Sequence, residues 1–174
     1  MSAERFVPVR LARVVLRDGA EQQWIFLQEV NGKRGFPIVI GTAEAGEIHR
    51  VLADEPLPRP LTHQLALAAI QALGSRLLRV DIVDLRNNTF FARLVLAGLE
   101  EGVQEVHVDS RPSDALALAL RAGAPLRVAD SVLEQVRTDM APDSLDPDSI
   151  DPDSYDPDSL GPDSMGPGAP PESD

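Results

Sequence analysis

A five-residue repeat near the carboxyl end limits what this chain can fold into. Each unit starts with Pro-Asp-Ser and contributes one apolar side chain; the units begin at Pro142, Pro147, Pro152, Pro157 and Pro162. One apolar residue in five cannot offset the entropy of ordering, and a proline every five residues interrupts helices and strand ladders. We therefore predict a folded domain over 1–140 and a disordered tail over 141–174.

Charge divides the chain at the same place. The sequence has 16 Lys+Arg and 28 Asp+Glu, for a net charge of −12. All basic residues lie in 1–140 beside 18 acids, so this part nets 16 − 18 = −2, whereas 141–174 hold the other 10 acids. The body is nearly neutral, which argues against a basic nucleic-acid-binding module.

The acidic tail has several candidate roles. The simplest is to keep the protein in solution. It is also a candidate for binding a protein partner, for phosphorylation at its repeated serines, or for self-inhibition as a polyanion that competes for a basic patch on the body. Calcium binding is disfavoured, because calcium sites need glycine turns and bidentate acids in closed loops.

Several classes of protein are excluded by what the sequence lacks. No apolar run approaches the roughly 18 residues that span a bilayer, so we expect no membrane association. The start, Met1-Ser-Ala-Glu-Arg, lacks the pattern of a secretory signal. The chain has no cysteine, which excludes a disulfide framework. We expect a cytoplasmic protein.

The first half of the body predicts three strands followed by two helices. These are Phe6–Leu16, Gln23–Val30, Phe36–Ile40, Glu44–Leu52 and Thr62–Leu73. Asp18-Gly19 marks the first turn. Thr42 and Thr62 are expected to cap the two helices, and Gly74 to end the second.

The second half repeats this order. Its strands are predicted at Arg79–Leu85, Thr89–Leu96 and Val103–Asp109, with a turn at Asn87-Asn88, and its main helix at 112–122. Pro112 suits the first helical position, Asp114 the first turn, and Gly123 the helix end. Ser131 and Glu134 predict a capping box for a last short helix. The fold class is therefore α+β: a duplicated β-β-β-α unit with mostly antiparallel sheets and packed helices.

Three clusters carry residues suited to chemistry. The first is Asp109-Ser-Arg111-Pro-Ser-Asp114, at a strand-to-helix junction. There Asp109 and Asp114 are candidate ligands for a hard cation, and Arg111 is a candidate phosphate-binding residue. The structural alternative is that Asp114 stabilises the helix start while Arg111 pairs with Asp109.

The other two clusters also lie at helix starts. In Arg59-Pro-Leu-Thr-His63, the histidine falls in a first helical turn, which favours a neutral imidazole that accepts a proton. Glu44 and Glu47 begin the first-half helix. For the first of these clusters, the structural alternative is a loop anchor followed by a histidine without a chemical role. For Glu44 and Glu47, it is simple compensation of the helix dipole.

Together these groups match the needs of metal-assisted phosphodiester hydrolysis. Carboxylates would hold Mg²⁺ or Mn²⁺, an arginine would offset phosphorane charge, and a histidine would move the proton. Whether the groups converge in space does not follow from the sequence.

At these residues the chain resembles the bifunctional nuclease domain family. The likeness rests on Phe36-Pro-Ile-Val-Ile-Gly-Thr-Ala-Glu-Ala45, Arg59-Pro-Leu-Thr-His63, and Asp109-Ser-Arg-Pro-Ser-Asp-Ala-Leu-Ala-Leu-Ala-Leu120, and it covers roughly 7–135. The resemblance implies an α+β fold of duplicated units, self-association, and the DNase and RNase activity attributed to some members. Gln64 departs from relatives that often place an acid after the histidine.

The resemblance carries over no established catalytic set, so the roles below are our own expectations. His63, Glu44 and Asp114 are expected to be catalytic, Arg59 and Arg111 to bind nucleic acid, and Asp109 with Asp114 to bind Mg²⁺ or Mn²⁺.

The function we favour is a metal-dependent nuclease, a homo-oligomer that hydrolyses DNA and RNA. The alternative is a non-catalytic regulatory protein that uses the same strand-to-helix junction to bind a ligand or partner; a scaffold that recruits through its tail is a third possibility. Clustering of arginines on the folded surface would favour the nuclease.

Overall fold

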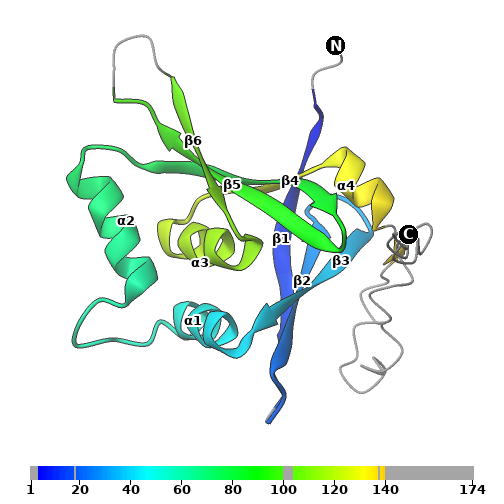
Figure 1. Ribbon diagram of the computed structural model, residues 1–174, viewed down its shortest axis with the longest axis horizontal. Coiled ribbons are helices and arrows are strands. Elements are labelled where there is room, and N and C mark those ends of the chain that lie inside the picture. Colours follow the sequence, from blue (N-terminus) through cyan, green and yellow to red (C-terminus); the bar gives the residue numbers. More distant parts are fainter. Residues whose placement is uncertain (1–3, 18, 100–103, 137, 140–174) are drawn as a thin grey trace, which may run out of the picture.

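The computed structural model describes residues 4–17, 19–99, 104–136 and 138–139 (Figure 1). The prediction of a disordered tail over 141–174 falls outside the described residues. So do Asp18 of the first predicted turn and Val103, the first residue of a predicted strand.

One sheet of eight strands organises the fold, in the order β6-β5-β4-β7-β1-β2-β3-β8. The strands are β1 Phe6–Val15, β2 Gln22–Glu29, β3 Arg34–Gly41, β4 Leu77–Arg86, β5 Thr89–Ala97, β6 Glu105–Ser110, β7 Leu126–Ala129 and β8 Thr138–Asp139. Every neighbouring pair is antiparallel except β4 with β7. Each half therefore supplies one three-stranded meander, and β7 joins the two. This confirms the predicted α+β class.

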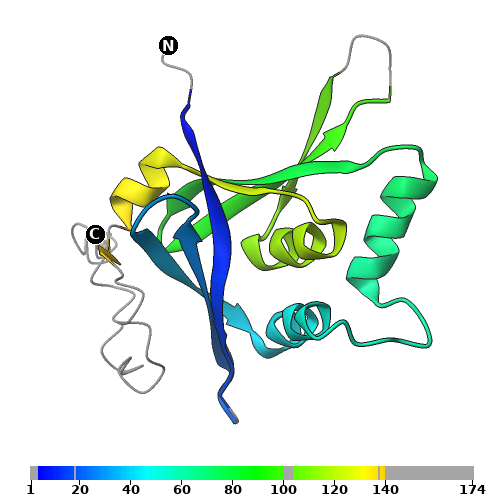
Figure 2. The same ribbon diagram turned by 180° about the vertical axis from the view of Figure 1, so that it is seen from behind.

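Four helices accompany the sheet: α1 Thr42–Leu52, α2 Thr62–Ala72, α3 Pro112–Ala122 and α4 Asp130–Gln135. Figure 1 and the reverse view in Figure 2 show α1, α2 and α3 grouped together and α4 on its own near β3 and β4. Residues of α1, α3 and α4 are buried in one core cluster with the sheet, whereas α2 has no fully buried residue. None of the described helices has the length and apolar character needed to cross a membrane.

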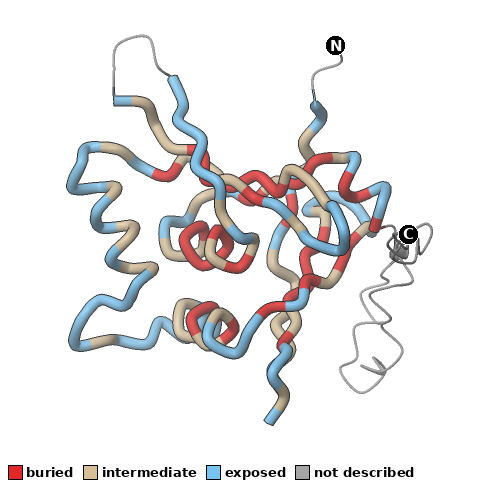
Figure 3. Tube along the Cα trace, viewed as in Figure 1, coloured by how far each residue is buried: buried red, intermediate tan, exposed pale blue. Residues whose placement is uncertain are grey.

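The sheet bends strongly around α3. The rings of Phe36 in β3 and Phe90 in β5 stack with centroids 5.3 Å apart, although these strands are far from each other in the sheet order. Figure 3 shows the buried residues concentrated on α3 and the central strands. The alternating alanines and leucines of α3 suit this position, because Ala115, Ala117 and Ala119 let neighbouring elements approach closely.

The turn residues adopt the backbone conformations that the sequence predicts. Asn87 and Asn88 have φ values of 48° and 57°, as a two-residue type I′ hairpin requires. Gly123 ends α3 with φ 63°, and Gly74 follows α2 with φ 85°. Pro112 occupies the first turn of α3.

Strand β7 was not predicted from the sequence. It holds only four residues, too few to show an alternating pattern, and it directly follows Pro125. Its position is central: Val128 pairs with Val7 of β1 on one side and with Ile82 of β4 on the other.

The predicted helix caps are wrong by one residue at Thr42 and Thr62 and by two residues at Ser131. Gly41, Leu61 and Ala129 are the N-caps of α1, α2 and α4, so Thr42, Thr62 and Ser131 lie inside the helices and give no side-chain cap. At α2 the backbone N–H of Leu61 instead donates to Oε1 of Gln64, 2.9 Å away.

Candidate functional site

The first turns of three helices meet at one cleft of about 580 Å³. We call it the acid–histidine cleft. Its polar lining includes Glu44 from α1, His63 from α2, and Asp114 with the preceding Arg111 from α3. Helix starts carry backbone N–H groups without helical partners and the positive end of the helix dipole. The backbone therefore adds positive potential that stabilises the carboxylates lining the cleft.

Asp114 lies at the centre of this arrangement. Its Oδ1 is 2.9 Å from Nε2 of His63, and its Oδ2 accepts a hydrogen bond from Nε of Arg111 at 2.8 Å. Nη2 of Arg111 lies 2.8 Å from Oε1 of Glu44. One arginine therefore joins two carboxylates, and one of these carboxylates also holds the histidine.

The charge state of Asp114 follows from these contacts. Burial raises the pKa of its carboxyl, but the hydrogen bonds from Arg111 and His63 outweigh burial, so the pKa lies below the ordinary value of 3.8. Asp114, and then Glu44, raise the pKa of Arg111. Asp114 is thus ionised at neutral pH. When Nε2 of His63 donates to it, Nδ1 is the ring nitrogen left to accept a proton.

A second set of charges includes Glu47 and Arg50, which also line the cleft. Glu47 of α1 is 2% exposed and accepts hydrogen bonds from Nη2 and Nε of Arg121 in α3, at 2.6 and 2.9 Å. Arg50 donates to the other carboxylate oxygen at 3.2 Å. Burial raises the pKa of Glu47, but Arg121 and Arg50 outweigh it and the pKa is lowered. These contacts fix α1 against α3, which positions Glu44 opposite Arg111.

The role of this second set was not predicted from the sequence. Glu47 was a candidate for chemistry beside Glu44, with dipole compensation as the alternative, and Arg121 was not singled out. The i,i+3 spacing of Glu47 and Arg50 indicates an ion pair on a helix. Arg121 is 74 residues from Glu47, so its contact depends on the tertiary fold.

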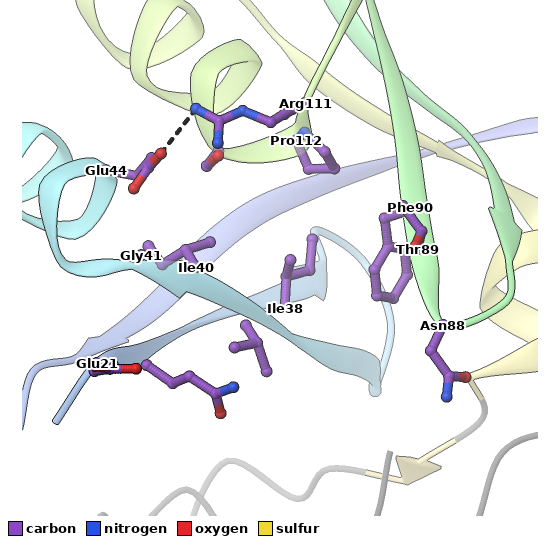
Figure 4. Close-up of a pocket in the computed structure, with 13 residues that line it drawn as sticks. Glu21, Ile38, Ile40, Gly41, Glu44, Asn88, Thr89, Phe90, Arg111 and Pro112 are labelled. Carbon is purple, nitrogen blue, oxygen red and sulfur yellow. Dashed lines mark ion pairs between the residues drawn. The ribbon is translucent and has the colours of Figure 1, made fainter. Parts of the chain in front are cut away.

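A second cleft of about 410 Å³ adjoins the first, and its lining includes Ile38, Ile40 and Phe90. Both clefts include Glu44 and Arg111 in their linings. Figure 4 shows the ion pair between these two side chains at one end of the second cleft. Arg111 is 66% exposed, so its guanidinium is accessible to a ligand in either cleft.

Two of the predicted site residues lie elsewhere. Asp109 is paired in register with Arg93 of β5 and lines neither of these clefts. Arg59 is exposed in the loop between α1 and α2 and also lines neither. The structure therefore brings together Glu44, His63, Arg111 and Asp114. It does not show the pairing of Arg111 with Asp109.

The observed geometry does not form a ready divalent-cation site. Within the described residues, no group of three or more acids and histidines is close enough to hold a metal ion. Both oxygens of Asp114 are already engaged, by His63 and by Arg111. Mg²⁺ prefers near-octahedral oxygen ligands, and here it would have to displace one of these partners.

The comparisons with known proteins agree with the sequence motifs. The family model of the bifunctional nuclease domain matches residues 25–141. A protein of Mycobacterium tuberculosis described as uncharacterized is 39% identical over 138 residues, which cover 79% of this chain and 80% of that protein. Bifunctional nuclease 1 of Oryza sativa subsp. japonica is 25% identical over 114 residues, 65% of this chain but 34% of the rice protein. The family match includes all four residues that converge at the acid–histidine cleft, and this chain belongs to the bifunctional nuclease domain family.

Proposed function

We propose that the protein hydrolyses phosphodiester bonds of DNA and RNA in the acid–histidine cleft. One observation carries the proposal: three motif segments, separate in sequence, place His63, Asp114, Arg111 and Glu44 in a chain of contacts of 2.8–2.9 Å. The bifunctional nucleases among the relatives support the reaction class.

The chemistry assigns one role to each group. Asp114 orients the imidazole of His63 and stabilises it when it is protonated. Nδ1 of His63 takes the proton from the attacking oxygen, which is a water or, in RNA, the neighbouring 2′-hydroxyl. That oxygen forms a bond to phosphorus as the bond to the leaving oxygen breaks. Arg111 and the helix N–H groups stabilise the charge on the phosphoryl oxygens.

Arg111 must exchange partners for this reaction. In the structure its charge is held by Asp114 and Glu44. A phosphate accepts the same forked donor geometry as a carboxylate. Substrate binding would therefore replace the contact to Glu44, which leaves that carboxylate as a hydrogen-bond acceptor for a water in the cleft. The leaving oxygen takes its proton from water. Because Arg111 borders both clefts, an extended nucleic-acid strand would pass it while occupying both.

The metal expected from the sequence stays a prediction. Mg²⁺ or Mn²⁺ bound near the cleft would polarise a phosphoryl oxygen and acidify a water. Since the described carboxylates form no ready site, the roles above involve the protein's own groups alone.

The test is hydrolysis of labelled single- and double-stranded DNA and RNA by the full chain, with Mg²⁺, with Mn²⁺ and with EDTA. Asp114→Asn removes the charge but keeps the shape, and we expect a rate loss on the order of a hundredfold or more. The matched control is Asp54→Asn, an exposed acid that lines neither cleft. Equal rates for wild type and folded Asp114→Asn would place the activity elsewhere, and activity only with added metal would establish the metal dependence.

A non-catalytic role is the second candidate. Its supporting observation is that the charges in the cleft neutralise each other in the structure, an arrangement suited to exchanging partners with an acidic ligand. Absence of cleavage on every substrate and with every metal would favour it. The homo-oligomer, a protein partner of the tail and the cytoplasmic location stay predictions.

A further inference from the structure

A surface that carries several arginines lies on the face of the sheet opposite the acid–histidine cleft. Ile25 and Leu27 of β2 point into the core, so the alternating Trp24 and Phe26 belong to the other face. In Figure 2, β1 crosses the front of the molecule here with no helix over it. We call this surface the β1–β2 arginine face; it consists of Arg10, Arg13, Arg17, Trp24 and Phe26.

Register places the two β1 arginines on this face. Arg10 lies opposite Gln28 and donates to its Oε1 at 2.7 Å, and Arg13 lies opposite Phe26. The guanidinium of Arg17 stacks over the ring of Trp24, 5.5 Å from its centroid. The face thus combines cationic groups with an aromatic surface.

Two of these cations have no counter-charge among the residues that the structure describes. Within the part of the chain that the structure describes, neither Arg10 nor Arg13 forms an ion pair with a carboxylate. Nη1 of Arg13 is buried and has no hydrogen-bond partner among the described residues. A buried donor without a partner is costly, so a carboxylate that reached Arg13 would be bound favourably.

Strand β8, which directly precedes the acidic tail in sequence, lies three strands from β1. Thr138 of β8 is paired with Gly35, Gly35 with Gln28, and Gln28 with Arg10. Three strand spacings separate the first and last residues of this row, about 14 Å. One five-residue repeat unit spans up to about 17 Å when extended, so the first units can reach Arg10.

We propose that the acidic repeat over 142–166 binds intramolecularly along the β1–β2 arginine face. The repeat carries no Lys or Arg, and its first three units each supply two aspartates and one apolar side chain. The aspartates match Arg10 and Arg13, which have no carboxylate partner among the described residues, and the apolar side chains match the partly exposed ring of Trp24. Because the tail is attached to the same molecule, its effective concentration is on the order of millimolar, and weak ion pairs suffice. Nucleic acid, which has to bind from solution, is the competing occupant that the test distinguishes.

The chain contains its own spectroscopic probes. Its single tryptophan, Trp24, lies on the face, and its single tyrosine, Tyr155, lies in the third repeat unit. Energy transfer from tyrosine to tryptophan is efficient only at short distance. The measurement is tyrosine-sensitised emission of Trp24 in the full chain, with Tyr155→Phe as the blank and dilution to separate intramolecular from intermolecular contact.

Docking predicts a clear dependence on salt and on two arginines. The sensitised emission is expected to fall at least ~3-fold between ~10 mM and ~1 M NaCl, where screening shortens from about 30 to 3 Å. The double variant Arg10→Gln/Arg13→Gln should show the same loss at low salt. The matched control is Arg59→Gln/Arg76→Gln, which removes two exposed arginines that lie outside this face and form no ion pair among the described residues. This control should keep the emission.

A further variant leaves the folded residues unchanged. Asp143→Asn with Asp146→Asn, Asp148→Asn and Asp151→Asn alters only the tail, so a loss of emission there cannot come from unfolding. The proposal would be overturned if the sensitised emission of the wild type at low salt were no higher than in urea. It would also be overturned if the two arginine double variants gave equal emission. A signal that disappears on dilution would overturn it too, as would a single-stranded oligonucleotide that quenches Trp24 while the tail variants change nothing.

Discussion

At the scale of single residues, Asp114 determines the state of the cleft. Its carboxylate contacts His63 and Arg111 at the same time. These contacts stabilise the ionised form, and the pKa of Asp114 is therefore lowered. A carboxyl whose pKa is lower in the folded than in the unfolded state stabilises the fold above its unfolded pKa. This contribution disappears as pH falls through the folded value.

The pH dependence of stability tests this coupling. Asp114→Asn should lower the free energy of unfolding at pH 7, and the difference from wild type should shrink as pH falls below about 4, where the unfolded carboxyl begins to protonate. Urea titrations at several pH values measure this. Glu55→Gln, in an exposed loop, serves as the control and should stay within about 0.5 kcal/mol of wild type at pH 7. A difference for Asp114→Asn that is constant over this pH range would contradict the assigned contacts.

At the scale of elements, two glycines differ in whether the backbone conformation requires them. Gly123 ends α3 with a positive φ, whereas Gly46 lies inside α1, where an added Cβ would approach only Nη1 of Arg50 at 3.5 Å. The same substitution should therefore have opposite effects. Gly123→Ala should destabilise the protein by roughly 1 kcal/mol and Gly46→Ala should stabilise it by up to about 1 kcal/mol. Thermal melting of both variants checks this, and a shared sign would refute it.

Elements with strong local signals were predictable from the sequence. Asn87-Asn88, Pro112 and Gly123 each restrict the backbone directly, and the structure confirms all three. Strand β7 was not predictable, because four residues show no period and its pairing depends on β1 and β4. The caps failed because an N-cap is defined by backbone conformation, and Gly41 and Leu61 adopt it without a capping side chain.

At the scale of the whole molecule, topology assembles the site. His63 and Asp114 are 51 residues apart, and they meet because α2 and α3 both begin at the same cleft. The sequence predicted the residue types and their place at helix starts, but not their convergence. It also assigned Asp109 to the site. In the structure Asp109 lies opposite Arg93 of β5, away from the cleft. Alternation along one strand does not reveal which residue of the neighbouring strand lies opposite, so this position could not be predicted.

The two proposed functions lie on different faces of the sheet. One face holds the helices and the acid–histidine cleft, and the other holds the β1–β2 arginine face. The nearly neutral body therefore conceals a local excess of arginine on β1, where Arg10 and Arg13 lack carboxylate partners among the described residues.

The most direct test of the account uses the three histidines of the chain. The measurement is the RNA cleavage rate of His63→Ala beside His49→Ala and His107→Ala, all checked for folding; both control histidines are exposed. If His63 is the base, its variant should lose activity on the order of a hundredfold or more, and added imidazole should restore part of it, while both controls keep the wild-type rate. A folded His63→Ala protein that cleaves RNA as fast as wild type would contradict the account.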